Sequence, residues 1–172
     1  MADFNRYTRE CAFSQLRPEL IQAMRDYFEN QKLVGIETTI LMCCETTSEK
    51  KTPNGSRGVL AFLEGEDPDT TVYTGMFVTP EWLVWALSGD KSGAVAAGAR
   101  LRVLRARVTV AWPSKEFRLE LAGFMNDTTE YVRGHLDLGS QPAAEKICKA
   151  VSTAVLEQKP PPQKERRRWF GI

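Results

Sequence analysis

The sequence predicts an α+β fold: a seven-stranded antiparallel, strongly bent sheet or partly open barrel, capped by a C-terminal helix and carrying an additional N-terminal helix. Residues 33–138 form a succession of short segments with β-type patterns, and one amphipathic helical pattern follows after Ser140. The apolar phase also shifts near Leu104, inside one of the predicted strands. Such a shift is typical of a bulge or bend, which a small coiled sheet needs.

The length of 172 residues suits one domain with a full hydrophobic core. We expect an N-terminal arm at residues 1–13, a single domain over 14–158 and a Pro-rich, basic-aromatic tail at 159–172. Hydrophobic residues make up 42% and charged residues 26%, as in ordinary soluble proteins. The formal net charge of +1 provides no global field that would attract nucleic acid.

No segment reaches 18 consecutive apolar residues, and the first residues lack the apolar core of a signal peptide. We therefore expect a cytoplasmic protein, with peripheral attachment to a membrane as the alternative. The cysteines form no C-x-x-C pair, and adjacent residues of a strand point to opposite faces, which favours reduced and mostly buried thiols. They are Cys11, Cys43, Cys44 and Cys148.

The first predicted element is a helix over residues 17–30, with Pro18 at its entry. Its apolar residues recur every four positions: Leu16, Leu20, Met24 and Phe28. The first strand follows from residue 33, and its apolar residues share one parity: Val34, Ile36, Ile40, Met42 and Cys44. A polar connection over residues 49–56 contains the turn signal Asn54-Gly55.

The next predicted strands cover residues 59–63, 71–78 and 82–87. The third of these is apolar on both faces, so it is either covered on both sides or part of a ligand or partner surface. Residues 88–99 are small and flexible and predict a long loop.

A hairpin with a two-residue turn at Pro113-Ser114 forms the fifth and sixth strands. This turn would pair Val110 with Phe117 and Val108 with Leu119 on the inner face, and Arg107 with Glu120 on the outer face. A seventh strand covers residues 130–138, where Gly134 would allow a close approach. The closing helix covers residues 142–158, with Ser140 as its N-cap and a proline run after it.

Seven strands followed by one helix resemble the pleckstrin-homology-like barrel, including its bacterial and GRAM-type relatives. The strand run 33–138, the helix 142–158 and the segment 77–85 (Phe-Val-Thr-Pro-Glu-Trp-Leu-Val-Trp) carry this resemblance. The helix at 17–30 lies outside the core plan of that family.

The resemblance implies a binding module for a lipid headgroup, a peptide or another protein. Family members that bind phosphoinositides use basic residues in and beside the loop after the first strand, and the corresponding residues here are Lys50, Lys51 and Arg57. That spacing calls for a further basic residue two positions before the arginine, where Gly55 stands.

Two further segments are candidate partner surfaces. Trp82 and Trp85 would form a binding or self-association surface if their strand lies at an open edge. The tail would engage a membrane or a partner protein, or remain a solvated end, through Arg166, Arg167, Arg168, Trp169 and Phe170.

Catalytic and metal patterns are weak. His135 is the only histidine, which excludes triads and metal sites built on several histidines within one chain. The acidic loop with Glu64, Glu66, Asp67 and Asp69 lacks the ligand spacing of a calcium loop. Arg100, Arg102, Arg105 and Arg107 suggest nucleic acid, but the pairing of Arg107 with Glu120 favours a salt-bridged outer face.

The sequence thus predicts a non-catalytic binding module without a cofactor, for a protein partner, for self-association or for an anionic lipid headgroup, and no nucleic acid partner. A chaperone-like or small-ligand-pocket α+β protein is the alternative. An enzyme that uses carboxylates such as Glu45 or Glu130 is a third hypothesis.

Overall fold

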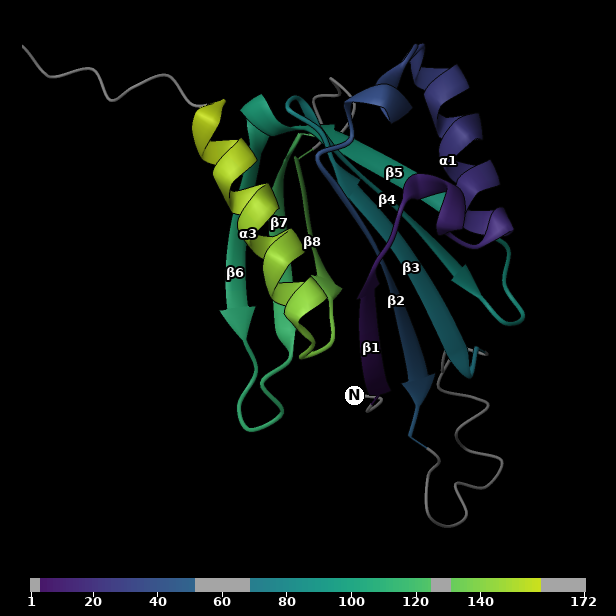
Figure 1. Cartoon of the computed structure of the whole chain (residues 1–172), viewed down its shortest axis with the longest axis vertical. Coiled ribbons are helices and arrows are strands. Elements are labelled where there is room, and N and C mark those ends of the chain that lie inside the picture. Colours follow the sequence, from purple (N-terminus) through teal and green to yellow (C-terminus); the bar gives the residue numbers. More distant parts are fainter. Residues whose placement is uncertain (1–3, 52–68, 125–130, 159–172) are drawn as a thin grey trace, which may run out of the picture.

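The computed structural model describes residues 4–51, 69–124 and 131–158. Within them, five antiparallel strands form sheet A in chain order: β1 (Phe4–Glu10), β2 (Met42–Lys50), β3 (Thr71–Val78), β4 (Trp82–Gly89) and β5 (Val95–Arg100). Three more antiparallel strands form sheet B: β6 (Leu104–Val110), β7 (Phe117–Phe124) and β8 (Tyr131–Asp137). The two α-helices are α1 (Pro18–Gln31) and α3 (Pro142–Glu157), shown with the strands in Figure 1.

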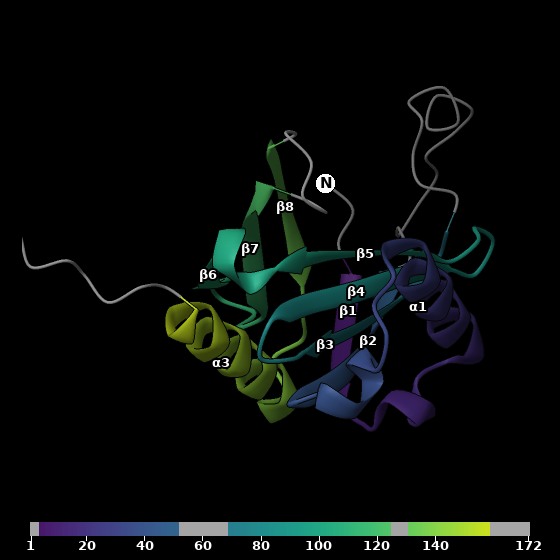
Figure 2. The same cartoon turned by 90° about the horizontal axis from the view of Figure 1, so that it is seen from above.

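The α+β class is confirmed, but the single sheet or barrel of seven strands is wrong. The described residues contain eight strands in two separate sheets that do not close into a barrel. Helix α1 packs on β4 and β5 of sheet A, whereas α3 contacts strands of both sheets. Figure 2 shows α1 and α3 on opposite sides of sheet A. The helix predicted at 17–30 therefore covers an open sheet face, preceded by strand β1.

The main core lies between sheet A, sheet B and α3. Helix α3 buries one apolar stripe at helical spacing, as predicted: Ala144, Ile147, Cys148, Val151, Ala154 and Val155. The same core includes Leu83 of sheet A, Leu101 of the chain between the sheets, and Leu119 and Leu136 of sheet B. Burying each large apolar side chain contributes about 1.5–3 kcal/mol. The helix begins at the N-cap Gln141, one residue after the predicted N-cap Ser140.

A second core lies between α1 and the other face of sheet A. Leu20 and Met24 of α1 pack with Phe77 and Val84. Cys43 belongs to this core, whereas its neighbour Cys44 belongs to the first, as expected for adjacent residues of a strand. Residues 82–84 of β4 are therefore covered on both faces, one of the two alternatives that its apolar sequence predicts, whereas Trp85 and Leu87 are only partly buried.

Three predicted boundaries are wrong for identifiable reasons. The arm at 1–13 contains strand β1, which the apolar pattern missed because Thr8 is its only buried residue. The first predicted strand begins too early, since a 3-10 turn covers Ile36–Thr39 and β2 starts at Met42. The predicted loop 88–99 contains most of β5. The small residues of this strand leave room for α1, since a Cβ on Gly98 would lie 2.9 Å from the Tyr27 Oη.

The hairpin register is confirmed, with Val110 opposite Phe117 and Arg107 opposite Glu120. The phase shift near Leu104 does not mark a bulge inside one strand: a 3-10 turn, Leu101–Val103, separates β5 of sheet A from β6 of sheet B. Gly134 makes no close approach, because a Cβ built there meets nothing within 4 Å. The strand predicted at 59–63 and the tail at 159–172 lie outside the described residues.

A polar junction joins β1 to the end of β8 and the start of α3. The backbone N–H of Gly139 donates to Thr8 Oγ1 at 2.9 Å, and the Thr8 N–H donates to Gln141 Oε1 at 2.9 Å. Arg6 adds ion pairs to Glu116 at 3.1 Å and Asp137 at 3.2 Å. These contacts tie the two sheets together where no backbone ladder joins them.

We predict that Gly139→Ala destabilises the protein by about 1–3 kcal/mol, the usual cost of forcing extra atoms into a packed site. A Cβ at this position would lie 1.9 Å from Gln141 Oε1 and 2.8 Å from the Arg6 carbonyl oxygen. Urea unfolding measures the change. Gly93→Ala is the matched control, because a Cβ there meets nothing within 4 Å. Equal unfolding midpoints for the two variants would show that the junction tolerates a side chain.

Candidate functional site

The outward side of sheet B carries a cluster of arginines, here called the arginine face. Alternate residues of a strand share a face, so the register fixes its members. Arg107 lies opposite Glu120, which lies opposite His135, and Arg105 lies in the same row as Arg133 through Ala122. Arg118 of β7 completes the face beside these two rows.

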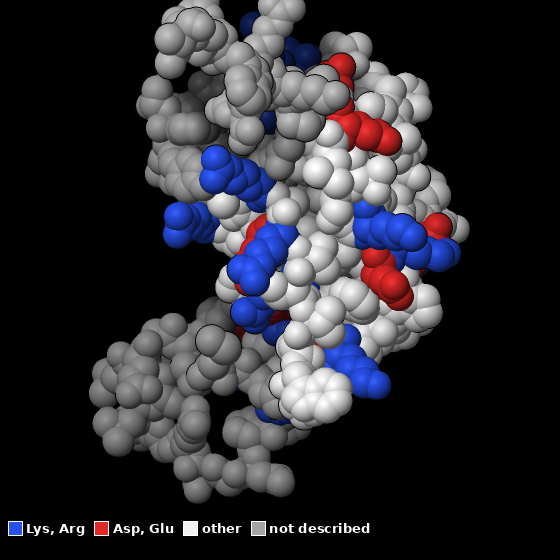
Figure 3. All heavy atoms as spheres, turned by 90° about the vertical axis from the view of Figure 1, so that its left-hand side faces the viewer, with Lys and Arg blue, Asp and Glu red and all other residues white. Residues whose placement is uncertain are grey.

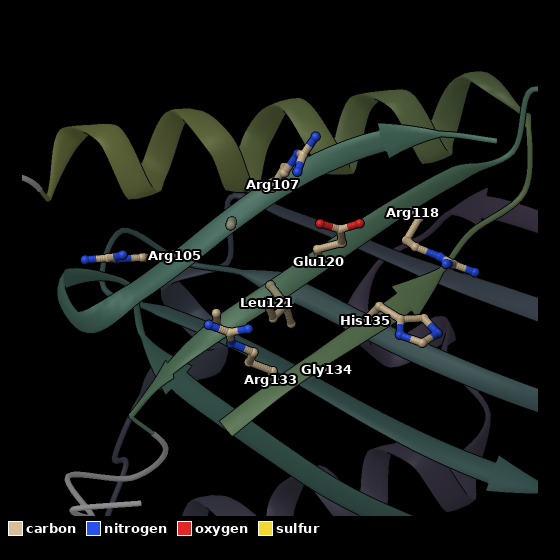
Figure 4. Close-up of a pocket in the computed structure, with 10 residues that line it drawn as sticks. Arg105, Arg107, Arg118, Glu120, Leu121, Arg133, Gly134 and His135 are labelled. Atoms are coloured by element: carbon tan, nitrogen blue, oxygen red, sulfur yellow. The ribbon is translucent and has the colours of Figure 1, made fainter. Parts of the chain in front are cut away.

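The arginine face is hollowed by a cavity of about 650 Å³ lined by its four arginines, Glu120 and His135. In Figure 4, Glu120 lies in the middle of the group, with Arg105, Arg107, Arg118 and Arg133 around it. Figure 3, which looks at the side of the molecule on which β6 lies, shows many blue cationic side chains with fewer red ones among them. The lining therefore carries an excess of positive charge.

The arginines of the face differ in their ion pairing, and those of β6 retain their positive charge without a carboxylate partner among the described residues. Arg118 pairs with Asp137, which also accepts from Arg6, and the hydrogen bond from Arg118 to Asp137 raises the pKa of Arg118. The predicted register of Arg107 and Glu120 is confirmed, but the predicted salt bridge between them is not formed. Within the described part of the chain, neither Arg105 nor Arg107 forms an ion pair, and both are exposed.

The hairpin between β6 and β7 exposes apolar side chains next to this face. Trp112 is 83% exposed and Val110 is 55% exposed. The turn is ordered by two backbone hydrogen bonds, from Ala111 N–H to the Glu116 carbonyl at 2.8 Å and from Lys115 N–H to the Ala111 carbonyl at 2.7 Å. Trp112 thus extends into solvent from an ordered turn and makes no contribution to the core. Tryptophan side chains favour the boundary between water and an apolar phase.

A second, apolar cavity of about 160 Å³ lies between the two sheets and is here called the inter-sheet pocket. Its walls come from β4 and from the strands of sheet B. They include Trp85, Leu87, Leu104, Leu121, Gly134 and Leu136.

The structure separates the residues that the sequence singles out. Trp82 is only 8% exposed and packs under Arg100, so it offers no partner surface, whereas Trp85 lines the inter-sheet pocket. Lys50 lies on β2 of sheet A, and Lys51 follows it, so neither belongs to the arginine face. Arg57, Glu130 and the tail residues 166–170 lie outside the described part of the chain.

The buried carboxylate Glu45 has a structural role. It is 4% exposed, and its two oxygens accept from Arg9 Nη2 at 3.0 Å and from the backbone N–H of Arg17 at 2.9 Å. Arg17 is the N-cap of α1, so Glu45 anchors the start of that helix to β2. Both of its oxygens are thus engaged in holding the fold together.

The cysteines are free thiols, as expected, and three of the four are buried. Burial raises the pKa of Cys44, and it raises the pKa of Cys148 to about 11, so both are held as protonated thiols at neutral pH. The described residues contain no group of three or more histidine, cysteine or acidic side chains that could hold a metal ion.

Asp69, at the end of the acidic loop, also serves the fold. Its carboxylate accepts hydrogen bonds from the backbone N–H of Lys91 at 2.7 Å and of Ser92 at 3.0 Å. Neighbouring Asp90 accepts from the Thr70 hydroxyl and from the Thr70 N–H. The two aspartates thereby link the start of β3 to the connection between β4 and β5. Glu64, Glu66 and Asp67 lie outside the described residues.

Comparison of the chain with protein-family models, with curated proteins and with solved structures finds no significant match. Neither described helix combines the length and the apolar character that crossing a membrane requires.

Sequence reasoning found half of the arginine face and missed the rest. The hairpin turn identified the pairing of β6 with β7, and with it the side on which Arg105, Arg107 and Glu120 lie. The pairing of β7 with β8 brings in Arg133 and His135, and no turn signal fixes that register. The alternation of Arg133, His135 and Asp137 along β8 was the available signal, because it marks one polar side of a half-buried strand.

We predict that Asp90 makes the stability of the fold depend on pH in the acidic range. Hydrogen bonds, that of the Thr70 hydroxyl above all, lower the pKa of Asp90 from 3.8 to about 2. Because the folded pKa lies below the unfolded one, the stabilisation is complete above about pH 4 and is lost as the pH falls towards about 2. Urea midpoints measured from pH 5 to pH 2 should therefore fall less steeply for Asp90→Asn than for the unmodified protein.

The control for this measurement is Glu29→Gln, which removes an exposed carboxylate of α1. Its pH profile should follow that of the unmodified protein. Parallel profiles for Asp90→Asn and the unmodified protein would contradict the prediction.

Proposed function

We propose that this chain is a non-catalytic binding module that attaches to a membrane surface by holding an anionic lipid headgroup on the arginine face. The observation that carries the proposal is a hollow with four arginines in which Arg105 and Arg107 are exposed and form no ion pair with a described residue. Guanidinium groups match phosphate oxygens with paired hydrogen bonds, and arginine is therefore the preferred residue for phosphate recognition.

The hairpin tip supports a membrane rather than a protein as the source of the anion. Trp112 and Val110 stand exposed at the end of β6, the strand that carries Arg105 and Arg107. Cationic residues are attracted to anionic headgroups, and a tryptophan beside them can enter the interface between the headgroups and the acyl chains. Each cation near an anionic membrane contributes about 1 kcal/mol, so the few here would give moderate, salt-sensitive binding.

The resemblance to pleckstrin-homology-like modules agrees with this proposal in the kind of ligand but differs in the place where the ligand binds. Members of that family bind headgroups beside the loop after the first strand, whereas the surface proposed here lies on sheet B. Lys50 ends β2 of sheet A, and Lys51 follows it, so neither lysine lies with the arginines of sheet B that would hold the headgroup.

We predict that Arg105→Glu combined with Arg107→Glu lowers binding to anionic vesicles at least about tenfold. Two favourable contributions of about 1 kcal/mol each are lost, and 1.4 kcal/mol corresponds to tenfold. Co-sedimentation with phosphatidylserine-containing vesicles at low and physiological salt measures the effect. Trp112→Ala should also weaken binding without changing the salt dependence.

Lys32→Glu combined with Lys149→Glu is the matched control, because it makes the same change of charge at exposed positions at the end of α1 and on α3. This variant should bind nearly as well as the unmodified protein. Equal losses in both double variants, or equal binding to uncharged vesicles, would refute the proposal. Binding of an acidic polypeptide but of no vesicle, lost in the Arg105/Arg107 variant, would identify a protein partner instead.

A further inference from the structure

Gly134 lines the inter-sheet pocket and leaves it open. The backbone conformation at this position does not call for glycine. Gly134 lies opposite Leu121, so a side chain at this position would point towards the interior of the molecule. A Cβ built there meets nothing within 4 Å, and its backbone does not have the left-handed conformation that favours glycine. The first atom of a side chain would therefore meet no clash at this position.

Gly134 is exposed, so the pocket opens to solvent at this position. Its walls are apolar, and apolar cavities bind apolar molecules. The walls supplied by Trp85, Leu87 and Leu136 offer apolar contacts on several sides. The pocket thus suits a short stretch of hydrocarbon better than it suits water.

The inter-sheet pocket lies next to the arginine face. Both cavities are lined by Leu121, Ala122, Gly134 and His135. Since β8 pairs only with β7 among the described strands, it forms an edge of sheet B, and the two cavities lie on its two sides. A ligand that crosses the edge of β8 would therefore contact residues that line both cavities.

We propose that the two cavities form one site for an anionic amphiphile with a single hydrocarbon chain. The phosphate or carboxylate group lies on the arginine face beside Arg133 and His135, and the first part of the chain enters the inter-sheet pocket. This inference rests on the proposed function and names its ligand class. The charge of one cavity and the apolar lining of the other match the two ends of such a molecule.

Alkyl phosphates of increasing chain length test the proposal by calorimetry, with inorganic phosphate as the reference. We expect affinity to rise about fourfold for each methylene that enters the pocket, the value for burial of a CH₂ group, and then to level off. In Gly134→Leu this rise, measured relative to the same variant's affinity for inorganic phosphate, should disappear, because the new side chain occupies the pocket. Gly134→Ala should give an intermediate result.

A contact measurement locates the chain independently of affinity. A bromine atom on the alkyl chain quenches a tryptophan that it touches, and Trp85 lines the pocket. Quenching by bromobutyl phosphate should be strong in the unmodified protein, reduced in Trp85→Phe and reduced in Gly134→Leu. Thermal unfolding shows whether these variants fold, and we expect Gly134→Leu to be at least as stable as the unmodified protein.

The outcomes separate this inference from the function on which it rests. Phosphate binding without any effect of chain length would overturn the pocket proposal and leave the arginine face intact. The same dependence on chain length in Gly134→Leu would also overturn it, because the chain would bind elsewhere. If neither phosphate nor any amphiphile binds, the proposed function fails, and this inference fails with it.

Discussion

Helix α3 packs against both sheets, and this packing sets their relative position. No backbone ladder joins sheet A to sheet B among the described strands, so their relative position is set by what fills the space between them. One helix face, with Ile147 and Val151 at its centre, contacts strands of both sheets. The polar junction around Thr8 and Gly139 adds a second link at the end of the helix. Together these contacts hold the two sheets in a fixed relative position.

This arrangement decides where charge can lie. The inner side of sheet B is committed to the core through Leu119, Leu121 and Leu136. With a side-chain period of two, the alternate residues of the same strands must point outward, and they are the arginines, Glu120 and His135. The arginine face is therefore a consequence of burying the other side of the sheet. Because α3 fills only part of the space between the sheets, the inter-sheet pocket remains at the side lined by Trp85 and Gly134.

Elements with a strong period were predictable, and elements with a weak one were not. Helix α3 and the hairpin of β6 and β7 follow the helical and alternating patterns closely, and their positions and register are confirmed. Strand β1 escaped prediction because polar partners hold its inward side, through Arg6 and Thr8. Strand β5 escaped because Gly98 and its alanine neighbours are poor strand formers, retained where α1 packs closely. In both cases a tertiary contact outweighs local preference.

The α+β class, the one-sided closing helix and the side of the hairpin on which Arg107 and Glu120 lie could all be predicted from the amino-acid sequence. These features depend on period and turn chemistry, which are local. The division of the strands into two sheets, the burial of Trp82 and the position of Arg133 on the same face as Arg105 emerge only from the folded structure. Those outcomes depend on which distant surfaces are buried against each other, and no local pattern encodes that choice.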